Sequence, residues 1–350
     1  MMFAFPFRHK NKKRQSDIPK VKKQSFLNGQ SMYGGFYGFS EGPFALNPDP
    51  RFLYLAHSHW QALSSMMSGV KEKKGTIVIT GEAGVGKTIL IYALLKDQSE
   101  KIKSAFVFNP RLNFNNMLEN VLRDLEVPVG EKGENTIALI ARFRKYLNER
   151  LDQDEIVTIV IDEAQSLDEE VLESLFRFAG PDLPAAKLLQ ILLVGHPELD
   201  VKLSSEKLRV FRNRIGVHCQ ITPLTREEGR GYISHRLKLV GRDISEVFTY
   251  DAVNRIWESA GGIPRIINLL CDRALTIGCS KARLIIDAKI VREAIKDSVY
   301  IRPSKPRTRT REFSPQEKSP YRIAGILFFL FSVCVFFLSL GIIVALLLRK

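Results

Sequence analysis

Eight consecutive residues, GEAGVGKT from Gly81 to Thr88, have the spacing of a phosphate-binding loop. The glycines let the backbone turn so that its N–H groups face inward around phosphate oxygens. A helix that begins near Lys87 adds its positive end. In this pattern the Lys87 amine reaches the β- and γ-phosphates, and the Thr88 hydroxyl holds Mg²⁺. The motif therefore predicts a nucleotide site.

The sequence also indicates which nucleotide this site takes. It has no N-K-x-D motif that would select guanine, and no zinc, Ser-His-Asp or Cys-His arrangement that would compete with the nucleotide site. The predicted ligands are therefore ATP and Mg²⁺. We expect the nucleotide to be bound by the loop and the residue after it, which are Gly81, Glu82, Ala83, Gly84, Val85, Gly86, Lys87, Thr88 and Ile89.

Two adjacent carboxylates follow the apolar run EIVTIVI, which is typical of a strand buried on both faces. Nucleotides bind at the carboxyl ends of the strands in a parallel sheet, so Asp162 and Glu163 can both face the nucleotide there. We predict that Asp162 joins Thr88 in holding Mg²⁺. We predict that Glu163 orients or deprotonates the attacking water. The site is then an ATPase site.

Arginines should complete the site, because negative charge develops on the γ-phosphate oxygens during transfer. The segment KLRVFRNRI supplies Arg209, Arg212 and Arg214, and GGIPRIINLL places Arg265 at the start of a predicted helix. The alternative at each place is a solvated basic face.

Alternating strand and helix patterns position these residues. Such alternation predicts a parallel sheet wrapped by helices, followed from about Thr225 by a purely helical unit. His57 and His59 stand at the start of a predicted helix, where we expect surface residues. The predicted strands cover 75–80, 104–109, 155–161, 188–195 and 215–222. A helix over 57–70 precedes the first strand, and the helices between the strands cover 89–96, 115–125, 137–150 and 168–180.

The chain divides by composition into five parts. The predicted fold is α/β, a P-loop NTPase with a parallel sheet, a following helical unit and one C-terminal transmembrane helix. The predicted parts are a basic flexible tail (1–32), a sheet domain with an N-terminal adaptor segment (33–223), a helical unit (224–300), a basic linker (301–322) and a transmembrane helix (323–348).

The transmembrane helix is predicted from the run Ile323–Leu348, which has no charged residue and exceeds the roughly 20 residues that cross a bilayer. Basic residues precede this run, and only Arg349 and Lys350 follow it. By the positive-inside rule, everything before the helix then lies in the cytoplasm. Four cysteines without C-x-x-C spacing are expected to be reduced thiols, which fits that compartment.

The formal net charge of +14 indicates an anionic partner, either nucleic acid or a membrane surface. Much of the charge lies in the basic flanks on either side of the predicted folded part. A transmembrane helix explains such flanks through anionic lipid and topology. Nucleic acid is therefore the second candidate.

The runs GPFALNPDPRFLYL, GEAGVGKT, IDEAQSL, LLQILLVGHPEL, LRVFRNRI and GGIPRIINLLCDRAL together resemble the general secretion pathway protein A family of ExeA-type AAA+ ATPases. The similarity covers about residues 36–298. MshM-type pilus-assembly ATPases are related to this family, and TniB-type transposition ATPases more distantly.

This resemblance implies that the α/β part is an AAA+ sheet domain and that the helical unit (224–300) is its helical lid. It implies that His196 stands at the sensor-1 position, where the family usually has glutamine. It implies that Arg265 is the sensor-2 arginine. It also implies that Arg214, or else Arg209, reaches the ATP of a neighbouring subunit in a ring or partial ring.

We expect a bacterial inner-membrane protein, single-pass, with its ATPase domain in the cytoplasm and an inner-membrane secretion or pilus-assembly protein as its partner. The alternatives are a nucleotide-dependent DNA-binding regulator of the transposition type and an ATPase-like scaffold without turnover.

Overall fold

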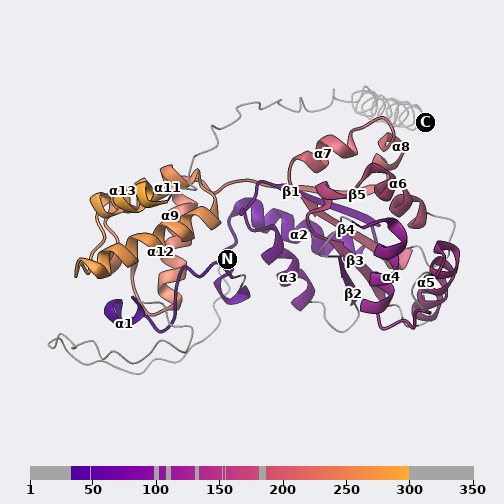
Figure 1. Ribbon diagram of the computed structural model, residues 1–350, viewed down its shortest axis with the longest axis horizontal. Helices are drawn as coiled ribbons and strands as arrows, with labels where there is room; N and C mark the ends of the chain where they lie inside the picture. The colour runs from indigo at the N-terminus through magenta and orange to yellow at the C-terminus, as the bar shows by residue number, and fades with distance from the viewer. Residues whose placement is uncertain are drawn as a thin grey trace, which may run out of the picture. The chain divides into compact units, whose positions relative to one another are not determined.

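A parallel β-sheet carries the carboxylates and the phosphate loop in the computed structural model (Figure 1). The structure describes residues 33–298 apart from 48, 98–101, 108–111, 131–133, 152, 154 and 181–186. All of them fall within one compact unit, Met1–Arg302. The strands are β1 (Thr76–Gly81), β2 (Ile102–Val107), β3 (Ile156–Ile161), β4 (Leu189–Gly195) and β5 (Ile215–Ile221).

The strand order is β2-β3-β4-β1-β5, and every pair is parallel. Parallel neighbours put their carboxyl ends at the same edge of the sheet, so the residues after β1, β3 and β4 meet there. The predicted α/β fold with a parallel sheet is confirmed. All five predicted strands are present, although β2 begins two residues earlier than expected.

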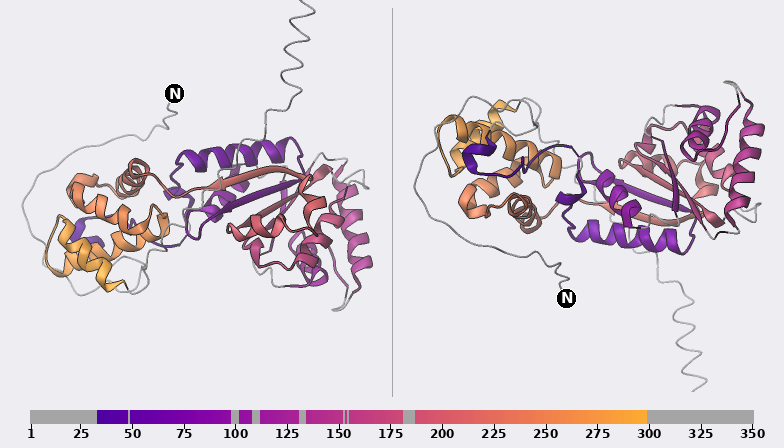
Figure 2. Two further views of the ribbon diagram at one scale, coloured as in Figure 1. Left: turned by 90° about the horizontal axis from the view of Figure 1, so that it is seen from above. Right: turned by 90° about the horizontal axis from the view of Figure 1, so that it is seen from below.

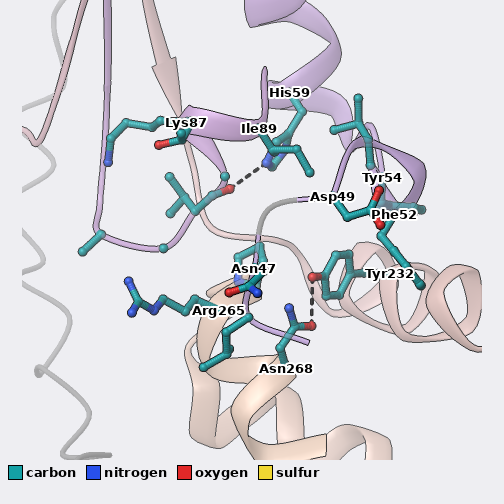
Figure 3. A pocket seen from close by; sticks show the side chains of 18 of the residues that line it. Asn47, Asp49, Phe52, Tyr54, His59, Lys87, Ile89, Tyr232, Arg265 and Asn268 are labelled. Carbon is teal, nitrogen blue, oxygen red and sulfur yellow. Dashed lines mark hydrogen bonds between the residues drawn. The ribbon is translucent and has the colours of Figure 1, made fainter. Parts of the chain in front are cut away.

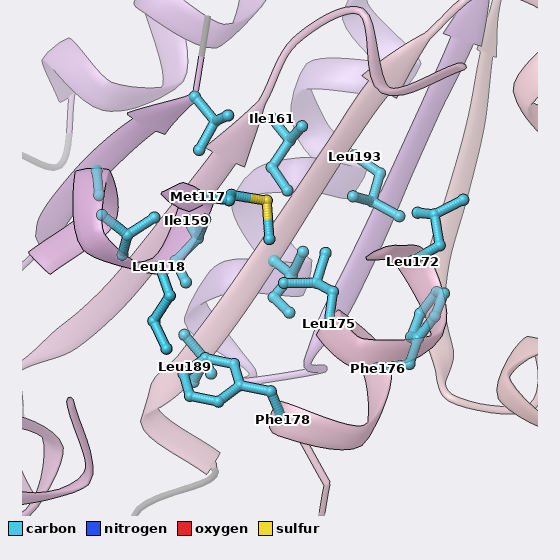
Figure 4. Close-up of a cluster of buried hydrophobic side chains, with 14 of the residues drawn as sticks. Met117, Leu118, Ile159, Ile161, Leu172, Leu175, Phe176, Phe178, Leu189 and Leu193 are labelled. Atoms are coloured by element: carbon cyan, nitrogen blue, oxygen red, sulfur yellow. The ribbon is translucent and has the colours of Figure 1, made fainter. Parts of the chain in front are cut away.

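Helices cover both faces of the sheet, as the two turned views show (Figure 2). The sheet helices are α2 (His57–Lys71), α3 (Lys87–Asp97), α4 (Phe114–Asp124), α5 (Thr136–Leu151), α6 (Glu169–Phe178), α7 (Glu198–Leu203) and α8 (Arg209–Arg212). Side chains alternate across a strand with a period of two. Val160 therefore packs with α2 and α3 on one face, whereas Ile159 and Ile161 pack with α4 and α6 on the other (Figure 4).

The helical part follows β5 and comprises α9 (Arg226–Leu239), α10 (Ile244–Val247), α11 (Tyr250–Ala260), α12 (Pro264–Ser280) and α13 (Ala288–Asp297). Local signals set its boundaries. Thr225 and Glu228 form a capping box that begins α9. Gly261, in the left-handed conformation with φ of 60°, ends α11, and Pro264 occupies the first turn of α12. The end of α11 at Gly261 and the start of α12 at Pro264 place Arg265 in the first turn of α12.

Rings of the N-terminal segment belong to the core of the helical part. This segment contains α1 (Gly34–Tyr37) and the 3₁₀ turn η1 (Pro50–Phe52). Tyr33, Tyr37, Phe39, Phe44 and Phe52 are all buried in the cluster formed by α9, α11, α12 and α13. The segment thus contacts the helical part, although the sequence groups it with the sheet domain. The bounds of the five predicted parts stay predictions.

Among the described residues of 33–298, no helix is both long enough and apolar enough to cross a membrane. The predicted flexible tail, linker and transmembrane helix (1–32, 301–322 and 323–348) lie outside those residues.

Candidate nucleotide-binding site

The phosphate loop joins the end of β1 to the start of α3, as its motif predicts. Gly84 and Gly86 have φ angles of 80° and 109°, which L side chains rarely adopt. A Cβ atom on Gly84 would lie 2.7 Å from the Arg265 Cβ. The loop backbone therefore approaches α12 closely, and the Arg265 N–H donates to the Gly84 carbonyl at 3.2 Å.

Lys87 is buried at the start of α3. Its amine donates to the carbonyl oxygens of Gly81 at 2.8 Å and Glu82 at 3.0 Å. Burial lowers the pKa of this amine below its ordinary value of 10.5, against the opposing charges of Glu163, Asp162 and Glu198. The amine is thus a desolvated cation that donates to neutral backbone carbonyls. A bound phosphate would give it a negatively charged hydrogen-bond acceptor.

Thr88 and Asp162 are brought into direct contact although they are 74 residues apart. The Thr88 hydroxyl donates to Asp162 Oδ2 at 2.9 Å. A hydroxyl and a carboxylate are oxygen ligands, which Mg²⁺ prefers, and Mg²⁺ is usually completed by phosphate oxygens and water. In the described part of the chain, no group of three or more His, Cys, Asp or Glu side chains could hold a metal. The pair therefore fits Mg²⁺ shared with a bound nucleotide.

Glu163 directly follows Asp162 and has a left-handed backbone, with φ of 55° and ψ of 34°. Its carboxylate accepts a hydrogen bond from Gln165 Nε2 at 2.6 Å. His196, which follows β4, lies with Nε2 3.7 Å from Glu163 Oε2, beyond hydrogen-bond distance. Glu163 and His196 both line the pocket. A carboxylate in this position can accept a proton from water next to a bound phosphate.

The pocket that these residues share has a volume of about 590 Å³, within the range of roughly 300–1,000 Å³ typical of small-molecule sites. Its lining includes Ala83–Ile89, Glu163, His196 and Arg265. The structure thus brings most of the predicted site residues together. Gly81, Glu82 and Asp162 lie beside this pocket through the contacts given above, without being part of its lining.

Arg209 and Arg214 are not among the lining residues. Arg209 belongs to the short helix α8. The Arg214 guanidinium donates to the Phe176 carbonyl at 3.1 Å and lies 5.5 Å from the centre of the Phe211 ring. The structure therefore does not place either arginine at the nucleotide site of its own chain.

The opposite end of the pocket is lined by residues that the sequence did not single out (Figure 3). The Tyr232 hydroxyl of α9 donates to the Asn268 side chain of α12 at 2.9 Å, and both residues are buried. Arg236 donates to the Pro43 carbonyl at 2.5 Å and lies over the Phe52 ring at 4.6 Å. This end therefore joins the N-terminal segment to the helical part, and no local motif signals it.

His59 is a correction to the sequence interpretation, which placed it on the surface. It is buried, and its Nε2 lies 2.7 Å from the Val85 carbonyl (Figure 3). A carbonyl only accepts, so Nε2 carries the hydrogen, and Nδ1 has no hydrogen-bond partner among the described residues. A Cβ atom on Gly86 would lie 3.1 Å from the same nitrogen. His59 on α2 therefore contacts the phosphate loop and stabilises its conformation.

Burial lowers the pKa of His59 below its ordinary value of 6.5, although the Val85 carbonyl and the Glu228 charge oppose the shift. The unfolded chain then takes up a proton at a higher pH than the folded chain, so stability is lost as pH falls below about 6.5. We expect the melting temperature of His59→Gln to decrease less between pH 7 and pH 5 than that of the wild type.

Thermal unfolding followed by circular dichroism at several pH values measures the slope of melting temperature against pH. Part of this slope should remain in His59→Gln, because burial also lowers the pKa of His235. His57→Gln is the control, because His57 is exposed and stands on the same helix. A wild-type slope in His59→Gln would contradict the expectation.

The parallel sheet, the phosphate loop and the Asp-Glu pair after β3 define an AAA-type P-loop NTPase. Residues 70–203 match the protein family described as an AAA domain. The chain is 34% identical to general secretion pathway protein A of Aeromonas hydrophila over 244 residues, which are 70% of this chain and 44% of that protein. The resemblance predicted from the motifs is thereby confirmed.

A second relative is an uncharacterized HTH-type transcriptional regulator of Methanocaldococcus jannaschii. It is 26% identical over 253 residues, which cover 62% of this chain and 61% of that protein. The chain therefore spans less than two thirds of either relative.

Two solved structures show the same fold. The Cdc6p protein of Pyrobaculum aerophilum has a TM-score of 0.60 and 19% identity, covering 74% of this chain and 71% of that one. The ORC2 protein of Aeropyrum pernix, described in ADPNP–ADP complexes, has a TM-score of 0.57 and 19% identity, covering 73% and 71%.

Proposed function

We propose that this protein is a membrane-anchored AAA+ ATPase that couples ATP binding and hydrolysis to the assembly or regulation of a secretion or pilus machine in the cell envelope. The observation that carries the ATPase part is the Thr88–Asp162 hydrogen bond at the phosphate loop, with Glu163 next to it. The similarity to general secretion pathway protein A supports the secretion part.

The chemistry proposed for the site uses this chain's own groups. Lys87 and the loop N–H groups bind the phosphates, and Thr88 and Asp162 would hold Mg²⁺, which neutralises charge on the phosphate oxygens when it is bound. Glu163 orients the attacking water and accepts its proton. His196 lies beside that carboxylate, and Arg265 stands over the loop at the start of α12.

Membrane anchoring is proposed from the apolar run Ile323–Leu348 and the basic residues before it. The chain would cross the bacterial inner membrane once, with the ATPase domain in the cytoplasm. The proposed assembly is a ring or partial ring in which Arg214 or Arg209 reaches the ATP of a neighbouring subunit. Neither arginine lines its own pocket, which is compatible with action on a neighbour.

A pull-down from detergent-solubilised membranes tests the machine that is served. Glu163→Gln with ATP should hold the complex in its nucleotide-bound form. Lys87→Met, which is expected to bind ATP about ten- to a hundredfold more weakly, is the matched control. We expect inner-membrane secretion or pilus-assembly proteins with the first variant and few with the second. Recovery of DNA-processing proteins instead would contradict the secretion assignment.

A nucleotide-dependent DNA-binding regulator is the second candidate. The similarity to a protein described as an HTH-type transcriptional regulator favours it, together with the net charge of +14. It requires a DNA affinity that falls steeply with salt and that is lost on deletion of residues 1–32. Binding to anionic vesicles without DNA affinity would support the membrane-anchored ATPase.

A further inference from the structure

Gln165 connects the segments that follow two neighbouring strands. Its Nε2 donates to Glu163 Oε2 at 2.6 Å, and its Oε1 accepts from the His196 backbone N–H at 3.0 Å. Glu163 follows β3 and His196 follows β4, which pair in parallel. We propose that Gln165 is a positioning residue that fixes the direction of the Glu163 carboxylate relative to the His196 segment. This inference rests on the proposed function, since it takes Glu163 as the group that activates water.

The orientation of the Gln165 amide follows from its two partners. The His196 backbone N–H can only donate, so the carbonyl oxygen of Gln165 must face it. The NH₂ group is then turned toward Glu163, whose ionised carboxylate can only accept. Both ends of one amide are therefore used, and a side chain with a single polar function could not make both contacts.

The surroundings also hold Gln165 in place. The Lys202 amine of α7 donates to the Gln165 backbone carbonyl at 2.7 Å. A Cβ atom on Gly195 would lie 2.7 Å from Gln165 Oε1 and 3.3 Å from its backbone nitrogen. The side chain thus passes directly over the last residue of β4, and a Cβ there would displace its amide.

Glu163 depends on this contact for its orientation. Its side chain is 52% exposed and lines the pocket, and within the described segments no other side chain donates a hydrogen bond to its carboxylate. Without Gln165 the carboxylate would sample several rotamers. A displacement of about 1 Å in a reacting group can cost about a hundredfold in rate. Gln165 itself is not part of the pocket lining, so it acts through Glu163.

Two substitutions separate the two contacts of Gln165. Gln165→Glu keeps an acceptor for the His196 N–H but, when ionised, repels Glu163 instead of donating to it, whereas Gln165→Ala removes both contacts. We expect kcat for ATP hydrolysis to fall about ten- to a hundredfold in both variants. KM and the affinity for a fluorescent ATP analogue should stay within about twofold, because Gln165 itself does not line the pocket and the phosphate loop is unchanged.

Hydrogen exchange of the amides around His196 supplies a readout without turnover. These amides should exchange at the wild-type rate in Gln165→Glu and faster in Gln165→Ala. Gly195→Ala is a further variant, because its Cβ would displace the Gln165 amide without altering Gln165 itself. We expect it to lower kcat as Gln165→Ala does.

The Glu163→Gln background tests whether Gln165 acts through Glu163. Under single-turnover conditions, adding Gln165→Ala to Glu163→Gln should lower the residual rate by no more than about twofold. A further tenfold loss there, a rise in KM instead of a fall in kcat, or wild-type kcat in both Gln165 variants would overturn the proposal. A wild-type protein without ATP turnover would instead overturn the proposed function itself.

Discussion

Glu163→Gln should lower the rate of ATP hydrolysis by about 10²–10⁴-fold, which is the usual contribution of a positioned general base. The substitution keeps the length of the side chain but removes the group that can accept a proton from water. The binding contacts from Lys87, Thr88 and the loop backbone are untouched. Nucleotide affinity should therefore stay within about threefold of the wild type, so that the loss is in kcat.

Phosphate release and the titration of a fluorescent ATP analogue measure the two effects separately. Glu170→Gln is the matched control, because Glu170 is an exposed glutamate in the first turn of α6, close to Glu163 in the chain. It should hydrolyse ATP at the wild-type rate. If Glu163→Gln also kept turnover within about twofold, the assignment of the base would be wrong.

The parts of the site that the sequence predicted are those whose chemistry is local in the chain. Gly81–Thr88 is one continuous stretch of the chain, and Asp162 and Glu163 follow a single apolar strand. The meeting of the two could also be predicted, because parallel strands bring their carboxyl ends to one edge. Thr88 and Asp162 indeed lie in hydrogen-bond contact.

The parts that the sequence did not predict depend on contacts between distant elements. His59 reaches the Val85 carbonyl from another helix, and Gln165 joins the segments after two strands. A histidine near a helix start and a glutamine after a strand are common on surfaces, so neither residue type signals a role. Their roles follow only from the register of β3 against β4 and from the packing of α2.

The packing of the N-terminal segment also depends on a distant part of the chain that the sequence does not identify. Aromatic rings of this kind are typical of a segment that packs onto a folded part, and Tyr37 and Phe44 are buried. The partner of these rings is the helical part, which the chain reaches only after all five strands. Aromatic composition predicts burial but carries no information on which distant element provides the surface.

Lys87→Met should remove most of the affinity for ATP while leaving the nucleotide-free protein folded. Hydrogen bonds to charged groups contribute about 1.5–3 kcal/mol, and 1.4 kcal/mol is a factor of ten in affinity. Loss of the amine should therefore weaken ATP binding by about ten- to a hundredfold. ADP, which lacks the γ-phosphate, should lose less than ATP.

The burial of the Lys87 amine in the nucleotide-free protein explains why Lys87→Met should still fold. The amine is a buried cation whose pKa is lowered by burial, so replacing it with a neutral side chain of similar length removes a desolvation cost. That gain opposes the loss of the hydrogen bonds to the Gly81 and Glu82 carbonyls. We therefore expect little change in the melting temperature of the nucleotide-free protein.

Melting with and without Mg-ATP distinguishes binding from folding in one experiment. At a nucleotide concentration of about 100 times Kd, the wild type should gain about 2.7 kcal/mol of stability. Lys87→Met should gain much less at the same concentration. Lys71→Met, at an exposed position on α2, should gain as much as the wild type. Equal stabilisation of Lys87→Met and the wild type would show that the phosphates do not depend on this amine.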